Sequence, residues 1–449
     1  MNPNIFREYD IRGKIPDELD RDVVYDLGLS FGTYFRDLGT QRISLGRDCR
    51  LSSSDFRDTL LDGLIKTGMQ VVDVGMIPTP LLYFSLFHLG VEGGLQITAS
   101  HNPSDYNGFK ICRGKTTIYG DEIQKIRKIA EMGQFQEGKG GVEEADVIRP
   151  YLDHMAGNVQ TGTVERKVVI DGGNGMAGMV APDAYRQMGV TVETLYCDPD
   201  GRFPNHHPDP TIPDNLKDLI QKVKDGAADL GIGFDGDADR IGVVDQKGNM
   251  IWGDQLMIIF SRDLLERQPG AKIIGEVKCS QVMFDDIEKH GGQPIMWKAG
   301  HSLIKSKMKE ENALLAGEMS GHLFFADKYF GFDDAIYAGA RLLEILSRKE
   351  MGIAELLADV PKMMNTPEIR MDCPDEKKFG VVAALTEEFK KDYTVIEVDG
   401  ARVIFDGGWG LIRASNTQPA LVLRFEAADE KKLEKIKSIF MDKLNPMIR

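Results

Sequence analysis

One unit recurs three times along the chain: a short apolar strand, a helix that ends at a glycine, and a second strand that follows at once. The helix–glycine–strand junctions lie at residues 64–74, 185–195 and 287–297, and the strands expected before the helices lie at 42–45, 167–170 and 271–274. A glycine at the end of a helix can adopt the left-handed conformation that stops the helix. A strand, a helix and a strand at this spacing form a right-handed crossover in a mainly parallel sheet. The repeat therefore predicts three similar α/β domains.

A further apolar strand follows each unit, and each of these strands runs into a polar segment. The three segments are 98–103 (Thr-Ala-Ser-His-Asn-Pro), 235–240 (Asp-Gly-Asp-Ala-Asp-Arg) and 317–322 (Gly-Glu-Met-Ser-Gly-His). In open α/β sheets, ligands bind outside the carboxyl ends of the strands. We therefore expect the three domains to place these three loops around one cleft.

The chain from about residue 361 lacks the crossover repeat. Helices are expected at 375–391 and 429–444, and strands at 393–405 (one strand or a hairpin), 411–413 and 421–425. Such a pattern predicts an α+β domain. The predicted fold class is α/β, with three similar α/β domains that have mixed, mainly parallel sheets around a central cleft, plus a smaller α+β C-terminal domain. The expected boundaries are 1–147, 148–251, 252–361 and 362–449.

Charge and composition exclude several classes of protein. The 449 residues include 55 Lys and Arg against 70 Asp and Glu, a net charge of −15. Such a chain lacks the positive field that attracts nucleic acid or anionic membranes, so neither is expected as a partner. Five scattered cysteines without a C-x-x-C pair predict neither a disulfide framework nor a zinc site. No signal-peptide pattern and no apolar stretch of roughly 20 residues is present, which predicts a cytoplasmic protein. The expected assembly is a monomer or a small homo-oligomer.

Asp235, Asp237 and Asp239 alternate in a short segment. In an extended backbone, alternate residues project to one side, and three carboxylates brought together repel one another unless a cation lies between them. Hard oxygen ligands suit Mg²⁺ or Ca²⁺. A calcium EF-hand loop needs Gly at its sixth position and Glu at its twelfth, where this chain has Arg240 and Gln246. Mg²⁺ is therefore the expected metal, and a solvated acidic turn is the alternative.

Ser100 and His101 stand at the end of the strand that precedes them. Adjacent Ser and His side chains need not touch, no G-x-S-x-G elbow indicates an α/β-hydrolase, and an ordinary turn is the alternative. The equivalent position of the Asp segment one repeat later favours a functional role, because the hydroxyl of Ser100, or a phosphate on it, is a natural fourth ligand for Mg²⁺. Lys110 has apolar neighbours on both sides, which would lower its pKa toward an acid/base range; an exposed lysine is the alternative.

Two further polar sets offer groups for a sugar phosphate. Glu318, Ser320 and His322 alternate and would face one way if extended, offering groups suited to sugar hydroxyls or phosphate. A phosphate needs several convergent donors, with Arg supplying a planar fork. The second set consists of such donors: Arg413, Ser415, Asn416 and Thr417. For both sets, an ordinary polar turn is the alternative.

One glycine motif favours a different function. Gly173, Gly175 and Gly178 fit G-x-G-x-x-G between a strand and a helix, with Asp198 about 20 residues on, which is the pattern of dinucleotide-binding sites. Gly-rich turns also occur for packing alone. An NAD-dependent sugar dehydrogenase would leave the Asp segment and the 413–419 loop unexplained, but it remains the alternative enzyme.

Five motifs, in order, resemble the α-D-phosphohexomutase superfamily and in particular its bacterial phosphomannomutase/phosphoglucomutase group. They are 6–13 (Phe-Arg-Glu-Tyr-Asp-Ile-Arg-Gly), 98–103, 235–240, 317–322 and 413–417, and they extend over essentially the whole chain. The 317–322 segment is similar to the sugar loop of the glucose- and mannose-type enzymes, since glucosamine-phosphate mutases typically have Gln in place of Met319.

The resemblance implies a set of site residues. Ser100, with His101 beside it, would be phosphorylated in the active enzyme, and Mg²⁺ would be held by this phosphate with Asp235, Asp237 and Asp239. Glu318 and Ser320 would bind sugar hydroxyls with His322 nearby, and the donors of 413–417 would bind the phosphate that is not reacting. The resemblance adds six further residues, with Lys110 as the general acid/base and His301 as a second candidate: Tyr9, Arg12, Lys110, Arg240, Lys278 and His301.

The expected reaction is the reversible interconversion of a hexose 1-phosphate and a hexose 6-phosphate, of mannose, glucose or both. It would pass through a hexose 1,6-bisphosphate, which would also act as an activator. Mg²⁺ and Arg240 would stabilise the phosphoryl charge. Because the Arg413 loop lies on the fourth domain, we expect this domain to move as ligand enters and leaves. A sugar-phosphate sensor that has lost the chemistry is the non-enzyme alternative.

Overall fold

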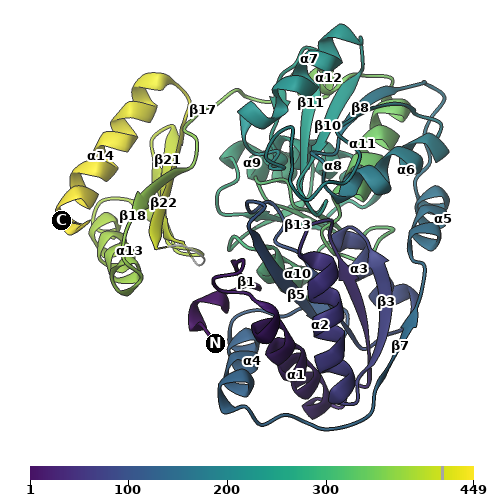
Figure 1. The fold of residues 1–449 in the computed structure, drawn as a ribbon. Helices are drawn as coiled ribbons and strands as arrows, with labels where there is room; N and C mark the ends of the chain where they lie inside the picture. The colour runs from purple at the N-terminus through teal and green to yellow at the C-terminus, as the bar shows by residue number, and fades with distance from the viewer. Residues whose placement is uncertain (416–418, 449) are drawn as a thin grey trace.

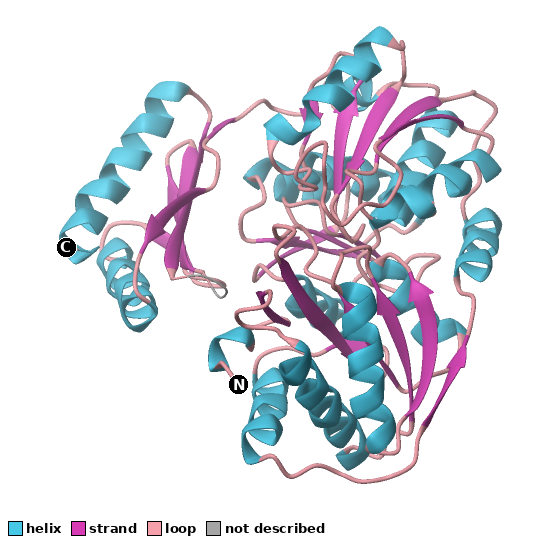
Figure 2. Ribbon diagram, viewed as in Figure 1, coloured by secondary structure: helices cyan, strands magenta, loops and turns pink. Residues whose placement is uncertain are grey.

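The computed structural model describes residues 1–415 and 419–448, and within these ranges the strands form four sheets with helices packed against them (Figures 1 and 2). The first three sheets combine parallel strands with an antiparallel edge, and the fourth is antiparallel. Loops of the first three units meet near the middle of the molecule (Figure 2). The predicted fold class is confirmed.

The first sheet has the strand order β1-β5-β4-β2-β3-β7, with β6 paired to β5. Strand β2 runs parallel to β3 and β4, whereas β5 runs antiparallel to β4 and β1. Its strands are β1 (Ile11–Lys14), β2 (Arg42–Arg47), β3 (Gln70–Met76), β4 (Gly93–Ile97), β5 (Tyr106–Arg113), β6 (Thr116–Thr117) and β7 (Gly141–Glu144). The helices of this part are η1 (Pro3–Ile5), α1 (Arg21–Asp37), α2 (Ser53–Lys66), α3 (Thr79–His88) and α4 (Asp121–Met132).

The second sheet has the order β12-β11-β10-β8-β9, in which β8 runs parallel to β9 and β10. Its strands are β8 (Lys167–Asp171), β9 (Thr191–Leu195), β10 (Leu230–Phe234), β11 (Ile241–Asp245) and β12 (Met250–Ile251). The helices here are α5 (Ile148–Asn158), η2 (Met176–Met179), α6 (Ala181–Gln187), η3 (Pro213–Leu216) and α7 (Lys217–Asp225).

The third sheet has the order β14-β13-β15-β16, and only its last pair is antiparallel. Its strands are β13 (Lys272–Glu276), β14 (Gln293–Trp297), β15 (Leu315–Gly317) and β16 (Leu323–Phe325). The helices are α8 (Gly253–Arg267), α9 (Gln281–Lys289), α10 (His301–Glu311), α11 (Ala335–Lys349) and α12 (Ile353–Leu356).

The fourth sheet has the order β17-β22-β21-β20-β19, with β18 also paired to β22. Helices α13 and α14 pack on it in the part at the left of Figure 1. Its strands are β17 (Met364–Asn365), β18 (Ile369–Asp372), β19 (Thr394–Ile396), β20 (Ala401–Phe405), β21 (Gly408–Ala414) and β22 (Ala420–Ala427). Its helices are α13 (Asp375–Lys390) and α14 (Glu430–Ile448).

The three predicted crossovers are β2–α2–β3, β8–α6–β9 and β13–α9–β14, each joining parallel strands. In each crossover the helix is followed by a glycine with positive φ: +90° at Gly68, +80° at Gly189 and +82° at Gly291. A side chain would strain this left-handed conformation. The repeat and its glycine signal are thus real features of the backbone.

The largest apolar core runs through all of the first three units. It joins Leu81 of α3, Ile232 of β10, Leu256 of α8 and Tyr337 of α11, all fully buried. The fourth unit has its own core around Leu385, Phe425 and Phe440. This division makes the first three units one packed body, to which the fourth is attached by a separate, smaller contact.

That smaller contact is apolar at its centre and contains a buried arginine. Val277 packs against Trp409 and Leu411 across the junction. The guanidinium of Arg402, itself fully buried, lies 3.8 Å from the Trp409 ring centroid and donates to the carbonyl oxygens of Val277 at 2.6 Å and Cys279 at 2.8 Å.

Two other expectations bear on the fold. All five cysteines lie within the described residues and are free, as expected from their spacing. Over the described ranges, no helix has the length and apolar character that crossing a membrane requires.

Candidate active site

The polar segments singled out in the sequence follow β4, β10 and β15, and the structure brings them into contact. The Ser100 hydroxyl, after β4, donates to Oδ2 of Asp235, after β10, at 2.8 Å. Arg240 donates from Nε to Nε2 of His322, after β15, at 2.9 Å. Three loops from three sheets therefore form one polar site at the carboxyl ends of their strands.

Ser100 sits in a strained turn. Its φ is +48°, a left-handed conformation that is costly for a residue with a Cβ. Its amide donates to Oγ1 of Thr98 at 3.0 Å, and its Oγ lies 3.0 Å from Nδ1 of His101. Burial and the nearby Arg240 and Arg12 charges hold the pKa of His101 well below its usual range. His101 is therefore a neutral imidazole beside the hydroxyl.

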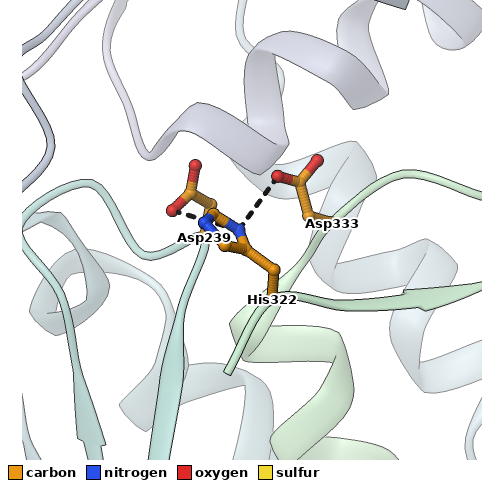
Figure 3. A group of neighbouring side chains, drawn as sticks. All are labelled: Asp239, His322 and Asp333. Carbon is orange, nitrogen blue, oxygen red and sulfur yellow. Dashed lines mark ion pairs between the residues drawn. The ribbon is translucent and has the colours of Figure 1, made fainter. Parts of the chain in front are cut away.

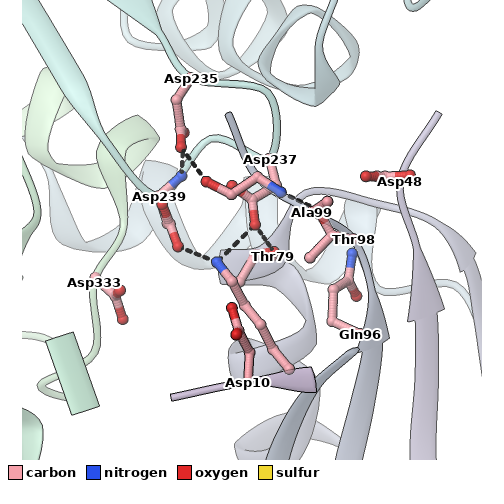
Figure 4. A network of polar contacts seen from close by, with 12 residues as sticks. Asp10, Asp48, Thr79, Gln96, Thr98, Ala99, Asp235, Asp237, Asp239 and Asp333 are labelled. Atoms are coloured by element: carbon pink, nitrogen blue, oxygen red, sulfur yellow. Dashed lines mark hydrogen bonds and ion pairs between the residues drawn. The ribbon is translucent and has the colours of Figure 1, made fainter. Parts of the chain in front are cut away.

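The three aspartates converge, but not in the way that their spacing predicts. Residues 235–240 form a turn rather than an extended strand, with Ala238 at φ +64°, so the expectation of an extended backbone is wrong. The carboxylates meet because the turn folds back: Asp235 accepts hydrogen bonds from the amides of Asp239 and Arg240, both at 3.1 Å. One oxygen from each of Asp235, Asp237 and Asp239 lies within 4.8 Å of the others, and all three residues are fully buried (Figure 4).

This cluster fits a divalent cation. Burial raises the pKa of Asp235 well above its ordinary value, and the Asp239 and Asp237 charges raise it further. Among the described residues, Oδ1 of Asp237 and Oδ1 of Asp239 are buried without a hydrogen-bond partner. Buried carboxylate oxygens that repel one another and lack donors are the setting in which hard cations bind.

Lys110 differs from the expectation. Its Nζ donates to Oδ2 of Asp237 at 2.7 Å and also to Asp239. Burial by itself lowers the pKa of Lys110, but the carboxylates of Asp237, Asp239 and Asp333 outweigh it and the net pKa is raised. The predicted lowering of this pKa is therefore wrong, because the flanking apolar residues say nothing of carboxylates supplied by another sheet.

The 318–322 segment is also a turn, not an extended strand. The amide of Glu318 donates to the carbonyl of His322 at 2.9 Å, which closes the β15–β16 connection. The turn therefore does not align Glu318, Ser320 and His322 as alternate strand residues. Glu318 Oε1 accepts from the Gly300 amide at 2.6 Å, and Ser320 is half-buried at the tip.

A compact charged group beside this turn contains two of the predicted histidines, His322 and His301, and Figure 3 shows His322 paired with Asp239 and Asp333. Nδ1 of His322 is 3.2 Å from Oδ2 of Asp333, and Nδ1 of His301 is 3.4 Å from the same oxygen. The two imidazoles stack with centroids 5.4 Å apart. Lys305 donates to Oδ1 of Asp333 at 2.8 Å. Burial and the Lys305 charge keep the pKa of His301 well below its usual range.

Tyr9, Arg12 and Lys278, three further residues of the predicted site, each have a polar partner. The Tyr9 hydroxyl donates to the Ala299 carbonyl at 3.1 Å, and the Tyr9 ring packs edge-on against His301. Arg12 pairs with Asp10, with Nη2 to Oδ2 at 2.6 Å. Nζ of Lys278 is 3.2 Å from Glu368 and 3.5 Å from Glu276.

The fourth unit reaches the site through β21. Arg413 Nε donates to Oδ2 of Asp399 at 2.8 Å, and the same oxygen accepts from the Ala299 amide at 3.1 Å. The Ser415 carbonyl accepts from Lys378 Nζ at 2.6 Å. The predicted phosphate donors Asn416 and Thr417 lie outside the described residues.

The glycine motif that favoured a dinucleotide has another explanation. A Cβ on Gly178 would lie 1.9 Å from the Cys197 carbonyl oxygen, and one on Gly175 would lie 2.7 Å from that of Gly236. Both glycines are required because neighbouring backbone approaches closely. Gly175 in particular lets the 173–178 turn pack on the loop that carries the aspartates.

Several residues of the site escaped the sequence reasoning. Thr79 donates to Asp237 at 2.6 Å, and Glu276 accepts from the Met319 amide at 3.1 Å. Asp333 gave no signal, since it follows no predicted strand. Arg50, which holds the Ser100 loop, lies three residues after the end of β2. Expecting functional residues after the first strand of each unit as well would have pointed to it.

Comparison with known proteins places this geometry in a family. The models for phosphoglucomutase/phosphomannomutase alpha/beta/alpha domains I, II and III match residues 3–137, 149–248 and 252–364, and the model for the C-terminal domain of the same proteins matches 368–443. The chain belongs to the phosphoglucomutase/phosphomannomutase family. The resemblance found in the sequence is confirmed, and the comparisons give no support to a dehydrogenase.

Relatives of this family match over nearly their whole length. A phosphomannomutase/phosphoglucomutase of Pseudomonas aeruginosa is 46% identical, over 98% of this chain and 95% of its own. A phosphoglucomutase of Neisseria gonorrhoeae is 45% identical, over 97% of this chain and 96% of its own. The crystal structure of a phosphoglucomutase/phosphomannomutase family protein from Burkholderia thailandensis has a TM-score of 0.93 at 41% identity, covering 100% of this chain and 98% of that one.

Proposed function

We propose that the protein interconverts hexose 1-phosphates and hexose 6-phosphates of glucose, mannose or both, with Ser100 carrying the phosphoryl group in transit. The observation that carries this proposal is the 2.8 Å contact between the Ser100 hydroxyl and Asp235. It places the only serine of the 98–103 loop against a cluster of three buried carboxylates. Family membership and near full-length relatives named phosphomannomutase/phosphoglucomutase support the same activity.

The reaction balances as two transfers. In the first, the bond between phosphorus and Oγ of phosphorylated Ser100 breaks, a bond forms between phosphorus and a free sugar hydroxyl, and the hydroxyl proton ends on Ser100 Oγ. The product is a hexose 1,6-bisphosphate. After this intermediate turns around, its other phosphate returns to Oγ and the serine proton passes to the sugar oxygen released. Free bisphosphate would restore phosphate to an empty Ser100, which makes it an activator.

Protons would be transferred by groups that lie beside the two reacting oxygens, Oγ of Ser100 and the sugar hydroxyl oxygen. His101, neutral and 3.0 Å from Ser100 Oγ, is placed to take and return the serine proton. Lys110 and His301 are the candidates for exchange with the sugar hydroxyl. Lys110, held charged by Asp237 and Asp239, begins as an acid and would give a proton to the sugar oxygen released in the second transfer. The neutral His301 is the candidate base that takes the hydroxyl proton in the first transfer.

Mg²⁺ is the metal that the donor set fits. Asp235, Asp237 and Asp239, together with a phosphate on Ser100, would hold it as hard oxygen ligands. When bound, it would neutralise charge on the phosphoryl oxygens during transfer. Arg240 lies beside this group and contributes a fixed positive charge of its own.

Residues from three units are proposed to recognise the substrate. Glu318 and Ser320, with His322 behind them, are proposed to bind the sugar hydroxyls. The phosphate that is not reacting would be bound by Arg413, Ser415, Asn416 and Thr417, and three further residues are proposed to bind the substrate: Tyr9, Arg12 and Lys278. Because the fourth unit has its own core and carries Arg413, we propose that the fourth unit, residues 362–449, moves to admit either end of the sugar. The other proposed boundaries are 1–147, 148–251 and 252–361.

Replacing the nucleophile tests the function. Ser100→Ala is expected to abolish interconversion of glucose 1-phosphate and glucose 6-phosphate while sugar-phosphate binding and the unfolding temperature stay close to those of the wild type. Ser104→Ala is the matched control, because Ser104 is an exposed residue of the same connection, and it should keep full activity. Undiminished turnover in Ser100→Ala would refute the assigned nucleophile. Wild-type protein that binds sugar phosphates but never interconverts them, with Mg²⁺ and bisphosphate present, would be a sensor instead.

A further inference from the structure

Arg50 is a buried arginine whose two terminal nitrogens donate hydrogen bonds to one loop. It follows β2 and is 2% exposed. Nη1 donates to the carbonyl oxygens of Pro103 at 2.6 Å and Tyr106 at 2.9 Å. Nη2 donates to those of Ser100 at 2.9 Å and Asn102 at 2.6 Å. All four acceptors belong to the seven-residue segment that begins at Ser100.

The surroundings keep this guanidinium in one place. Nε of Arg50 lies 3.2 Å from Oδ2 of Asp48, and Oδ1 of Asp48 accepts from the Ser53 hydroxyl at 2.5 Å, so the counter-charge is itself anchored to α2. The ring of Phe203, from the second unit, covers the guanidinium at 5.2 Å. Gly201 permits that approach, since a Cβ there would lie 2.5 Å from Cα of Arg50.

The loop held in this way is the strained one. Ser100 has a φ of +48°, and a serine keeps that conformation only where its surroundings impose it. On its other side, the Ser100 carbonyl meets the Asp loop so closely that a Cβ on Gly236 would lie 2.4 Å from it. The carbonyl that Arg50 holds is thus the one that sets the distance between the Ser100 loop and the Asp loop.

We propose that Arg50 is a positioning residue for phosphoryl transfer: it fixes the backbone of the Ser100 loop so that Oγ points at Asp235. This inference rests on the proposed function and adds to it a residue that touches neither the sugar nor the metal ligands. Its planar fork is what the role requires, because two nitrogens at a fixed separation bind carbonyls on both sides of the turn. A lysine keeps the charge but offers one nitrogen.

The test uses Arg50→Lys in the full-length protein, with Arg341→Lys as the control. Arg341 is equally buried and pairs with Asp327 in the third unit, so it matches Arg50 in burial and charge but does not touch the loop.

The assay measures phosphorylation of Ser100. Glucose 1,6-bisphosphate labelled with ³²P supplies the phosphoryl group, and rapid quench measures the rate at which Ser100 takes the label. We expect Arg50→Lys to lower this rate by about 100-fold, since small misplacements of a reacting group cost this much, while KM for glucose 1-phosphate changes by less than about threefold. Arg341→Lys should leave the rate within about threefold of the wild type, even if its unfolding temperature falls.

Hydrogen exchange of the peptide 98–107 gives a second readout that does not depend on catalysis. Exchange in the folded protein should speed up in Arg50→Lys and stay unchanged in Arg341→Lys. Labelling at the wild-type rate, or labelling that falls no further than in the control, would overturn the role of Arg50. If wild-type Ser100 itself takes no label, it is the proposed function that fails, and the two failures are therefore distinguishable.

Discussion

Lys110 donates a hydrogen bond from Nζ to Oδ2 of Asp237 at 2.7 Å, so a buried ammonium borders the carboxylate cluster. The same nitrogen contacts Asp239, while Asp235 is bound by the Ser100 hydroxyl and two amides. The Lys110 ammonium thus contacts two of the three carboxylates. The ammonium and a divalent ion compete for overlapping oxygens, and this competition can be measured.

Removing the ammonium should strengthen metal binding. Lys110→Met takes away a positive charge within hydrogen-bond distance of Asp237, so we expect the dissociation constant for Mg²⁺ to fall by about tenfold, or about 1.4 kcal/mol. Isothermal titration calorimetry on protein stripped with EDTA measures the constant. Turnover should fall in the same variant if Lys110 exchanges a proton with the sugar.

Two further variants make the metal experiment specific. Asp237→Asn should weaken Mg²⁺ binding, because it removes a charged ligand, whereas Lys125→Met should leave it unchanged, since Lys125 is an exposed lysine paired with Glu122. Weaker Mg²⁺ binding in Lys110→Met would show that the metal does not bind among these carboxylates.

The sequence predicted which segments form the site better than it predicted the conformations of those segments. The crossovers could be predicted because glycine and apolar periodicity act locally. Because ligands bind outside the carboxyl ends of strands in open α/β sheets, the sequence also indicated that Ser100, Asp235 and Glu318 lie around one cleft. The shape of each loop could not be predicted, because Ala238 at φ +64° and Ser100 at φ +48° are imposed by packing between sheets. The pKa of Lys110 was missed for the same reason: its two partners lie 127 and 129 residues away.

Asp334 predicts a pH dependence of stability. It begins α11, where its Oδ1 accepts from the Tyr337 amide at 2.8 Å and its Oδ2 accepts from the hydroxyls of Tyr151 and Tyr329. Burial raises the pKa of Asp334 from 3.8 to about 6. Between these two values the folded protein keeps a proton that the unfolded chain has lost, so stability falls as the pH rises through this window.

Asp334→Asn isolates that effect, because an amide keeps the acceptor at the helix start and does not titrate. Relative to this variant, the wild type should lose about 3 kcal/mol of unfolding free energy between pH 3.8 and pH 6, at 1.36 kcal/mol for each pKa unit. Urea denaturation at a series of pH values measures both proteins. Parallel curves for the two proteins across this window would contradict the prediction.

Two glycines should respond in opposite ways to alanine. Gly178→Ala would place a Cβ 1.9 Å from the Cys197 carbonyl oxygen and should destabilise the protein by 2 kcal/mol or more, roughly the cost of overpacking a fixed backbone. Gly157, inside α5, has open space around its Cα, so Gly157→Ala should stabilise by about 0.5 to 1 kcal/mol. Thermal unfolding measures the stability of both variants. Neither glycine contacts the reacting groups, so turnover of the folded protein should stay unchanged in both. A Gly178→Ala protein as stable as the wild type would remove the packing explanation of the glycine motif.

Arg402 is expected to stabilise the attachment of the fourth unit to the third unit. Besides the Val277 and Cys279 carbonyls, it donates to Oε1 of Gln281 at 3.1 Å, and burial lowers its pKa to about 10. Arg402→Met keeps much of the apolar volume against Trp409 but leaves these acceptors without a donor, which should cost about 3 kcal/mol.

Three measurements test the attachment of the fourth unit in this variant. Small-angle X-ray scattering should show a larger radius of gyration, and proteolysis should cut sooner between residues 357 and 368. Because Arg413 reaches the site only when the unit is docked, KM for the sugar phosphate should rise more than kcat falls. Lys390→Met, a surface change in the same unit, should alter none of these. A compact Arg402→Met protein with normal KM would show that the other contacts across the junction, such as Lys278 with Glu368, hold the unit without Arg402.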